Sequence, residues 1–426
     1  MNYLLGILQP VFDVVQKLCS VDFAYHSAVG SDRSAEHFSH GYFAVPANNC
    51  GYDITDGHNR AGRRRDDSHE GIYTVSAEIT HRDCLAFYFF KRQLIWVVLG
   101  AVAAAIAAHL PLSVLRQGTP VVLAAALILT VLTFIPGIGE PIMGARRWLF
   151  LFGQSFEPSE LVKFSVVLYL ASIFSKKQDR INDPINALLP PLLVVSLFVT
   201  LIYLQNDFST AFFIVLIALA MFLIAQVRII YFVLLSLLFV PVGGMLLFTK
   251  AHRVRRLMAF LNPLADPSGS GYQVIAAQSA FVSGGFWGRG LGRGVKKLGG
   301  LPEAHSDFIY AVVGEEAGFL GAVLVLALFV LLAWRGFSLV MKGKDSFSRY
   351  LAFGITSTIT LQALLNIAVT IGLVPATGIP LPLFSSGGSS MLVTLVMGGI
   401  LINISRQGVQ QSQKESKLNL NAGWRG

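Results

Sequence analysis

From Leu94 onward, the chain is a succession of long apolar runs separated by short polar segments. Most runs have about the 20 residues that an α-helix needs to cross roughly 30 Å of hydrocarbon. Helices suit a bilayer because they satisfy their own backbone hydrogen bonds. We therefore predict an all-α, polytopic transmembrane bundle of about nine or ten spans. The visible spans are 94–110, 119–137, 157–175, 187–204, 209–226, 229–248, 306–335, 350–374 and 388–405.

The composition excludes a water-soluble fold. Hydrophobic residues make up 54% of the 426-residue chain and charged residues only 13%, whereas soluble domains carry about 25% charged residues. One water-soluble core could not bury so much apolar surface. The net charge of +9 would suggest nucleic acid in a soluble protein. In a membrane protein, Lys and Arg instead set the orientation or meet anionic headgroups, so we expect no nucleic-acid partner.

Basic residues cluster in three segments that follow predicted spans. These residues are Lys176, Lys177 and Arg180; Arg335, Lys342, Lys344 and Arg349; and Arg406, Lys414 and Lys417. Counting crossings places all three segments on one side, which the positive-inside rule makes cytoplasmic. The segments 140–156, 249–305 and 375–387 then lie outside, and 409–426 is a cytoplasmic tail.

The first 90 residues differ from the membrane domain, which we place at 91–408. Either they lie outside, or a weak extra helix near 3–24 brings the N-terminus to the cytoplasmic side; we favour the second alternative. The three cysteines, Cys19, Cys50 and Cys84, show no metal-ligand spacing. We therefore favour an atypical N-terminal segment over a zinc site, and we predict no resident metal site elsewhere.

The outer segment 249–305, which precedes the eighth helix of a ten-helix count, is strongly basic. An anionic ligand and anionic phospholipid are equal alternatives for this surface. Its charged residues are Lys250, Arg253, Arg255, Arg256, Arg289, Arg293, Lys296 and Lys297, against Asp266 and Glu303.

Titratable side chains gather where this segment enters the next helix. Glu303, His305 and Asp307 stand within five residues, and Glu315 and Glu316 follow about two turns later. Charged groups in a span are costly and face a bundle interior. Asp307 could cap the helix or complement its dipole, but the basic segment before it favours a functional role.

An ordered series of motifs over residues 87–407 resembles the SEDS family (shape, elongation, division and sporulation) of polytopic peptidoglycan polymerases. Each motif is weak alone, and the order is what carries the resemblance. The motifs are Gly144 to Trp148, Pro158 to Lys163, Gln205 to Thr210, Phe260 to Pro263, Gly271 to Gln273, Ser283 to Gly285, Gly290 to Gly292, Leu301 to Phe308, Gly314 to Glu316, Gly378 to Pro382 and Ser385 to Ser390.

The pattern around Leu301 to Phe308 resembles the division branch of the family more than the elongation branch, where Arg commonly replaces Ala304. Three features depart from the family pattern. Asn206 and Ser209 stand where Pro and Gly are usual, and Ser386 stands where Tyr is usual. The strong first helix of the family is also missing from residues 1–86.

The resemblance implies that the chain joins lipid II units into glycan strands at the outer face of the cytoplasmic membrane, in septal wall synthesis. Asp307 matches the essential acidic residue of the family, and we predict that it is the catalytic base. The implied partners are lipid II, a class B penicillin-binding protein and other division proteins. A divalent cation is left open. The alternatives are a lipid II flippase and a non-catalytic scaffold for the penicillin-binding protein.

The leaving pyrophosphate requires positive charge, because charge builds there in the transition state. We predict Lys163, Arg253 and Lys296 for this role, with Arg146 and Arg147 as further candidates. Lys163 shares a helix face with Glu160, so a structural Glu160–Lys163 pair is the alternative. The other predicted substrate-binding residues are Glu160, Asp207, Glu303, His305 and Ser389.

Two irregular segments allow a functional and a plain interpretation. The run Gly288 to Gly294 could cradle phosphate through backbone amides, although a flexible loop at the bilayer surface is the favoured interpretation. The element Pro380 to Ser390 is predicted to be a re-entrant or irregular turn that lines the polyprenol or sugar groove. Simple turn chemistry explains its prolines and glycines equally well.

Overall fold

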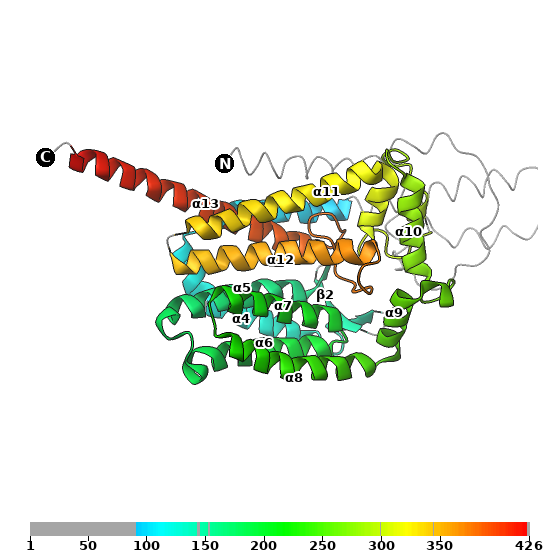
Figure 1. Ribbon diagram of the computed structural model, residues 1–426, viewed down its shortest axis with the longest axis horizontal. Helices are drawn as coiled ribbons and strands as arrows, with labels where there is room; N and C mark the ends of the chain where they lie inside the picture. Colours follow the sequence, from blue (N-terminus) through cyan, green and yellow to red (C-terminus); the bar gives the residue numbers. More distant parts are fainter. Residues whose placement is uncertain (1–90, 143–144, 152–153, 299, 344, 424–426) are drawn as a thin grey trace, which may run out of the picture.

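The computed structural model describes residues 91–142, 145–151, 154–298, 300–343 and 345–423. Long helices lie side by side in a bundle, and α9, α10 and a small sheet gather at one end of it (Figure 1). The bundle helices are Lys91–His109, α4 (Leu112–Leu132), α5 (Pro158–Lys176), α6 (Leu189–Leu204), α7 (Phe208–Ile224), α8 (Ile229–Phe248), α11 (Ile309–Lys342), α12 (Ser346–Thr370) and α13 (Gly388–Gly423). The end elements are β1 (Gly139–Ile142), β2 (Ala145–Leu151), β3 (Gln154–Phe156), α9 (Ala251–Leu261) and α10 (Tyr272–Gly284).

The predicted polytopic helical bundle is confirmed. Seven helices within the described residues are long and apolar enough to cross a membrane, and α7 is a shorter apolar helix. The predicted span 119–137 begins and ends too late, because the helix runs from Leu112 to Leu132 and includes Pro120. A proline is tolerated inside a membrane helix, since neighbouring groups can satisfy the backbone carbonyl that it frees. The proline before the helix, Pro111, is the one that stands at its boundary.

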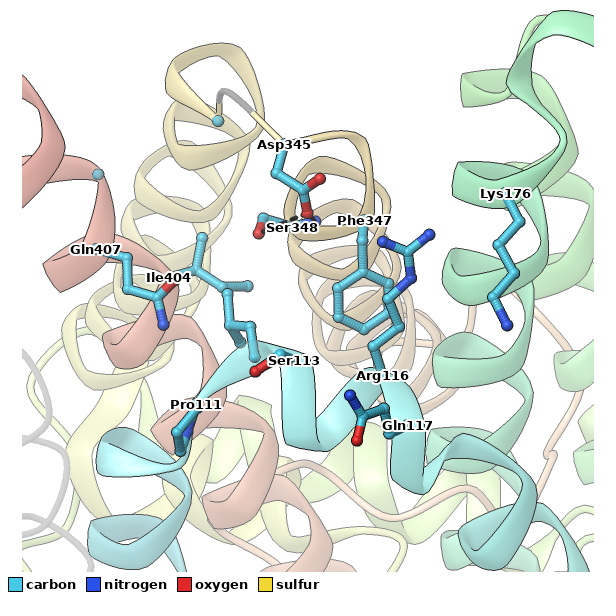
Figure 2. A pocket seen from close by; sticks show the side chains of 13 residues that line it. Pro111, Ser113, Arg116, Gln117, Lys176, Asp345, Phe347, Ser348, Ile404 and Gln407 are labelled. Atoms are coloured by element: carbon cyan, nitrogen blue, oxygen red, sulfur yellow. Dashed lines mark hydrogen bonds between the residues drawn. The ribbon is translucent and has the colours of Figure 1, made fainter.

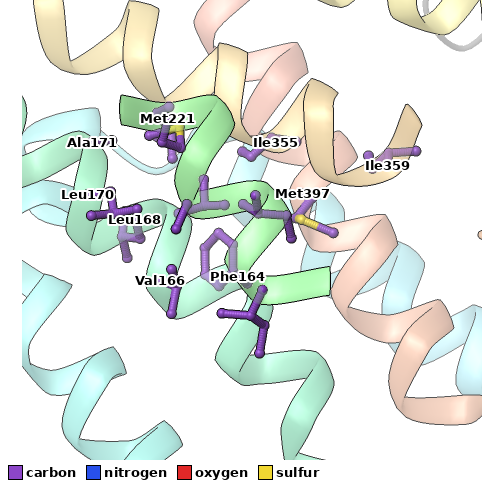
Figure 3. Close-up of a cluster of buried hydrophobic side chains, with 14 of the residues drawn as sticks. Phe164, Val166, Leu168, Leu170, Ala171, Met221, Ile355, Ile359 and Met397 are labelled. Atoms are coloured by element: carbon purple, nitrogen blue, oxygen red, sulfur yellow. The ribbon is translucent and has the colours of Figure 1, made fainter. Parts of the chain in front are cut away.

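Helix α5 occupies the centre of the bundle. It is largely apolar, as expected for a helix that neighbours surround, and most of its side chains are buried. Phe164 and Leu168 of α5 belong to the same buried cluster as Met221 of α7 and Ile355 of α12 (Figure 3). By contrast, α4 exposes apolar side chains such as Val121, which is 71% exposed. Apolar side chains of the bundle therefore lie either in a protein core or on a lipid-facing exterior.

The three basic segments meet at one end of the bundle, as counting the crossings predicts. Lys176 at the end of α5, Asp345 before α12 and Gln407 of α13 line one cavity there. Contacts at the opposite end join the sheet to the start of α7 and the loop before α11 to the end of α12. The bundle thus has a basic end and a loop-rich end.

Strands β1, β2 and β3 form an antiparallel sheet, where the sequence analysis expected only a connection. Side chains alternate along β2: Ala145 and Leu149 are buried, whereas Arg146 is exposed. Because successive strand residues point to opposite faces, Arg147 lies on the face of Ala145 and Leu149, and Arg146 lies on the other. This alternation decides which of the two arginines turns toward the bundle.

Helix α11 is interrupted at Gly318, whose φ of 68° and ψ of −166° are not helical. A Cβ at this position would lie 2.3 Å from the backbone nitrogen of Gly288. The loop after α10 uses this close approach: the amide of Phe319 donates to Gly285 O at 2.9 Å. The predicted continuous span 306–335 is therefore a short helix from Ile309, a break, and a longer helix to Lys342.

Candidate active site at the loop-rich end

Asp307 lies in a segment that two distant parts of the chain hold in place. Asn366 of α12 donates its Nδ2 hydrogens to Asp307 O at 2.8 Å and Ile379 O at 2.9 Å. Ser385 Oγ donates to Ser306 O at 2.5 Å, and the Ser386 amide donates to His305 O at 2.9 Å. The backbone that carries Asp307 is therefore fixed between α12 and the loop that precedes α13.

The Asp307 carboxyl does not cap α11. Phe308 occupies the N-cap position, and no side chain caps this helix. Instead, the carboxyl is half-buried beside the loop before α13, where a Cβ on Gly378 would lie 3.4 Å from Asp307 Oδ2. The capping interpretation of Asp307 is therefore wrong, and its carboxylate is available for another role.

The pKa of Asp307 is raised to about 6: burial has the largest effect, the neighbouring Glu303 carboxylate adds to it, and Arg256 and Arg147 oppose it. Asp207 also raises this pKa. These charges come from α9, β2, the start of α7 and the loop before α11, so the fold assembles them from four separate elements. A carboxyl with a pKa near neutral is a better proton acceptor than an ordinary aspartate and is still ionised at physiological pH.

Arg147 is held by an acidic partner. Its Nη1 lies 3.3 Å from Asp207 Oδ2, and Asp207 Oδ1 accepts the Thr210 amide at 3.1 Å, which caps α7. Burial lowers the pKa of Arg147, but Asp207, Glu157 and Asp307 outweigh it, so the pKa is raised overall. Arg147 is therefore a fixed, permanently charged group near Asp307.

Glu157 is a further acidic group that the sequence analysis missed. Its pKa is raised to about 7, chiefly by burial and then by the carboxylates of Glu160 and Asp207. Its Oε1 accepts the Ser159 hydroxyl at 2.8 Å. Its position directly before the Pro158 to Lys163 motif was the available signal.

Lys163 forms the buried pair that was the structural alternative to substrate binding. Its Nζ lies 2.8 Å from Glu160 Oε2 and donates to Gln362 Oε1 at 3.0 Å, and only 3% of the Lys163 side chain is exposed. Gln362 in turn donates to Pro380 O at 3.0 Å. Lys163 is thus connected to the Pro380 loop through Gln362, and direct contact with substrate stays a prediction.

Arg253 and Arg256 stand one turn apart on α9 but differ in their surroundings. The Arg253 guanidinium lies 4.9 Å from the centroid of the Tyr203 ring, and its Nη1 donates to Leu246 O at 2.8 Å. These contacts anchor α9 to the bundle. Arg256 is exposed and close enough to Asp307 to lower its pKa. The sequence analysis chose Arg253 for the pyrophosphate, but Arg256 is the one whose charge acts on Asp307.

Two carboxylates bind the backbone amides of the glycine-rich run. Glu316 accepts the amides of Gly292 and Gly294 at 2.9 and 3.3 Å, and Glu315 accepts those of Val295 and Lys296 at 3.1 Å each. Arg289 and Lys297 pair with the same carboxylates, which are almost fully buried. The phosphate-cradle interpretation is therefore wrong for the Gly292 and Gly294 amides. The run is also tied down, in contrast to the flexible loop expected.

The remaining predicted residues are spread around the site. Glu303 and His305 are exposed beside Asp307, with 3.9 Å between Glu303 Oε2 and His305 Nε2. Lys296 is half-buried, Arg146 is exposed on the outer face of β2, and Ser389 is buried in the first turn of α13. The structure thus brings Arg147, Asp207, Glu303 and His305 near Asp307, but it leaves Lys163 and Arg253 in internal contacts.

Among the described residues, no group of three or more His, Cys, Asp or Glu side chains could hold a metal ion. The zinc alternative at Cys19, Cys50 and Cys84, and the alternatives for the N-terminal helix, lie outside the described residues.

Comparison with known proteins matches residues 71–410 to the cell cycle protein family of FtsW, RodA and SpoVE. A probable peptidoglycan glycosyltransferase FtsW of Geobacter sp. (strain M18) is 39% identical over 319 residues, which cover 75% of this chain and 87% of the relative. Among solved structures, a chain of a peptidoglycan synthase complex matches with a TM-score of 0.63 and 29% identity, over 76% of this chain and 91% of the other.

The rod shape determining protein RodA of Thermus thermophilus matches with a TM-score of 0.53 and 26% identity, over 75% of this chain and 88% of the other. The curated relative named FtsW thus shares more identity with the chain than the RodA structure does. The family match covers the whole bundle, including the Asp307 segment and the loop before α13 that holds it. The chain therefore belongs to the FtsW, RodA and SpoVE family of multi-pass membrane cell cycle proteins.

Proposed function

We propose that the chain is a peptidoglycan glycosyltransferase that polymerises lipid II at the outer face of the cytoplasmic membrane during septal wall synthesis. The observation that carries this proposal is the Asp307 carboxyl, which has a pKa of about 6 and stands under the influence of Arg147 and Arg256. Relatives that cover most of the chain are named as peptidoglycan glycosyltransferases of the FtsW type, which supports the same activity.

The chemistry needs a proton acceptor and a stabilised leaving group. The 4-hydroxyl of the acceptor sugar attacks the anomeric carbon of the donor, and Asp307 takes the hydroxyl proton as the new glycosidic bond forms. The bond from the anomeric carbon to the pyrophosphate oxygen breaks, and undecaprenyl pyrophosphate leaves with the electron pair. Arg147 and Arg256 offset the negative charge that develops on this pyrophosphate.

The contacts of the basic residues decide which of them we assign to the pyrophosphate. Lys163 and Arg253 are engaged inside the bundle, so we assign the pyrophosphate to Arg147 and Arg256, with Lys296 as a third cation at the edge of the site. Within the described residues, the buried Arg147 Nε has no hydrogen-bond partner. A donor in that state suits a ligand oxygen, since buried polar groups are otherwise paired.

The charge at the two ends of the molecule supports an orientation in the membrane, and a similar structure supports a partner. The basic end holds Lys176, Arg349 and Arg406, which by the positive-inside rule supports a cytoplasmic position for this end and an outer position for Asp307. The similar structure belongs to a complex described as coordinating polymerization and crosslinking. We therefore propose a class B penicillin-binding protein as the crosslinking partner.

A polymerisation assay distinguishes the glycosyltransferase from two other candidate functions. A flippase moves lipid II and makes no polymer, and a scaffold recruits the penicillin-binding protein without polymerising anything. The clustering of Asp307, Glu303, Arg147 and Arg256 at one end favours an enzyme, because transport sites lie near the midplane. An Asp307 variant that recruits its partner but makes no glycan would show that one chain polymerises and recruits.

The deciding experiment measures lipid II polymerisation by the purified chain with its penicillin-binding protein. We expect Asp307→Asn to lower the polymerisation rate by about 10²-fold or more, the usual contribution of a general base. Asp179→Asn is the matched control, since Asp179 is exposed at the basic end. Normal glycan synthesis by folded Asp307→Asn protein would overturn the catalytic assignment. No polymer from the wild type would favour the flippase or the scaffold.

A further inference from the structure

A cavity of about 660 Å³ opens at the basic end of the bundle, far from Asp307. Residues of α4, α5, α12 and α13 line it (Figure 2). The volume is within the range of about 300–1,000 Å³ that is usual for small-ligand sites. Nothing in the proposed polymerisation uses this cavity.

The charge of the cavity wall is positive. Arg116 rises from α4 beside the Phe347 ring, with 5.7 Å between the guanidinium carbon and the ring centroid, and Lys176 stands on α5 nearby (Figure 2). Within the described residues, neither cation forms an ion pair. Asp345 is the acidic lining residue, and its carboxylate already accepts the amide and hydroxyl of Ser348 at 3.2 and 3.4 Å.

The other lining groups can donate hydrogen bonds to an anion. Ser113, Gln117 and Gln407 place hydroxyl and amide groups around the cavity. The N-terminus of α4 also reaches the wall at Leu112, and no side chain caps it. Its backbone dipole therefore adds to the positive potential that Arg116 and Lys176 create.

Apolar side chains of α4 near this cavity are exposed, as expected of a helix that faces lipid. Val114 and Val121 of α4 are 49% and 71% exposed, although both are apolar. A molecule with a phosphate headgroup and apolar tails would satisfy both surfaces, with its headgroup in the cavity and its tails along α4. We propose that this cavity binds the phosphate headgroup of an anionic membrane lipid.

The test measures binding of fluorescent phosphatidylglycerol and phosphatidylcholine to the purified full-length chain in detergent. We expect tighter binding of phosphatidylglycerol. Arg116→Gln and Lys176→Gln should each weaken that binding about five-fold, from about 1 kcal/mol for each basic residue near a membrane surface. Lys342→Gln is the control, because Lys342 is exposed at the same end but does not line the cavity.

Two further measurements separate the sources of the anion. Arg116→Lys keeps the charge and should bind nearly as the wild type does, which distinguishes lost binding from lost folding. Inorganic phosphate at millimolar concentration should displace the lipid weakly. If phosphate alone binds as tightly as phosphatidylglycerol through Arg116, the ligand is a soluble anion and the lipid assignment is wrong. Equal binding of both lipids, or unchanged binding by both Gln variants, would also overturn the proposal.

Discussion

At the scale of single residues, the environment of Asp307 makes a prediction about pH. A base must be ionised to accept a proton, and burial, with help from Glu303, raises the pKa of Asp307 to about 6. The polymerisation rate should therefore be maximal above this pH and fall as the pH drops through about 6. It should reach roughly a tenth of the maximum one pH unit below.

Rates of glycan synthesis at a series of pH values measure this midpoint. Glu157, whose pKa is about 7, is the competing titrating group, so Glu157→Gln is the control that should leave the midpoint near 6. A midpoint near 4 would mean that Asp307 is an ordinary aspartate. Loss of the transition in Glu157→Gln would assign it to Glu157.

The neighbouring arginines of α9 provide a matched pair. Arg256 acts on Asp307, whereas Arg255 lowers the pKa of Asp266 in the adjacent turn. Arg256→Gln should reduce kcat for polymerisation roughly 10-fold to 10²-fold, because it removes positive charge where the leaving group becomes negative. Arg255→Gln should change kcat less than two-fold, an order-of-magnitude expectation for a surface charge. Equal losses in both variants would show a general charge effect of the basic surface.

The residues of the site were partly predictable from the sequence. Asp307, Arg147 and Asp207 belong to motifs that the sequence shows directly, and the structure brings them together. Which of Arg253 and Arg256 acts on Asp307 was not predictable, since it depends on the orientation of α9 relative to Tyr203. Asn366 and Gln362 offered an overlooked signal, because amides inside an apolar span must find partners.

At the scale of elements, close backbone contact between helices decides packing. A Cβ on Gly399 of α13 would lie 2.3 Å from Ala104 O in the Lys91–His109 helix, whereas a Cβ on Gly398 would meet nothing within 4 Å. Gly399→Ala should therefore separate the two helices and cost about 1–3 kcal/mol of stability, as overpacking does.

Thermal unfolding of the purified protein measures this effect. Gly398→Ala is the matched control, because it makes the same chemical change one residue away and should leave the unfolding temperature nearly unchanged. Unfolding temperatures that coincide for the two variants would mean that the helices can move apart without cost.

The helices were predictable and the sheet was not, for one physical reason. A span of about 20 residues carries a strong apolar signal, so all nine predicted spans coincide with helices. The strands of 139–156 have only three to seven residues, too few to show a period-two pattern against the neighbouring runs. The break at Gly318 also depends on a contact with Gly288 that local sequence cannot show.

At the scale of the whole molecule, the two ends should lie on opposite sides of the membrane. Val282 of α10 and Met341 of α11 are 83% and 86% exposed at the loop-rich and basic ends. In a chain whose three native cysteines are replaced by serine, a membrane-impermeant maleimide should label Val282→Cys in intact cells. Met341→Cys should react only after the membrane is opened. The reverse labelling pattern would invert the proposed orientation.

The break in α11 has a mechanical consequence for the whole molecule. A span that meets a bilayer of different thickness can respond by tilting. Asp307 precedes the short helix that begins at Ile309, and Asn366 and Ser385 hold its segment, whereas the long lipid-facing helix begins only after Gly318. The long helix can therefore tilt with the surrounding membrane at the Gly318 break, while the Asp307 carboxylate keeps its position.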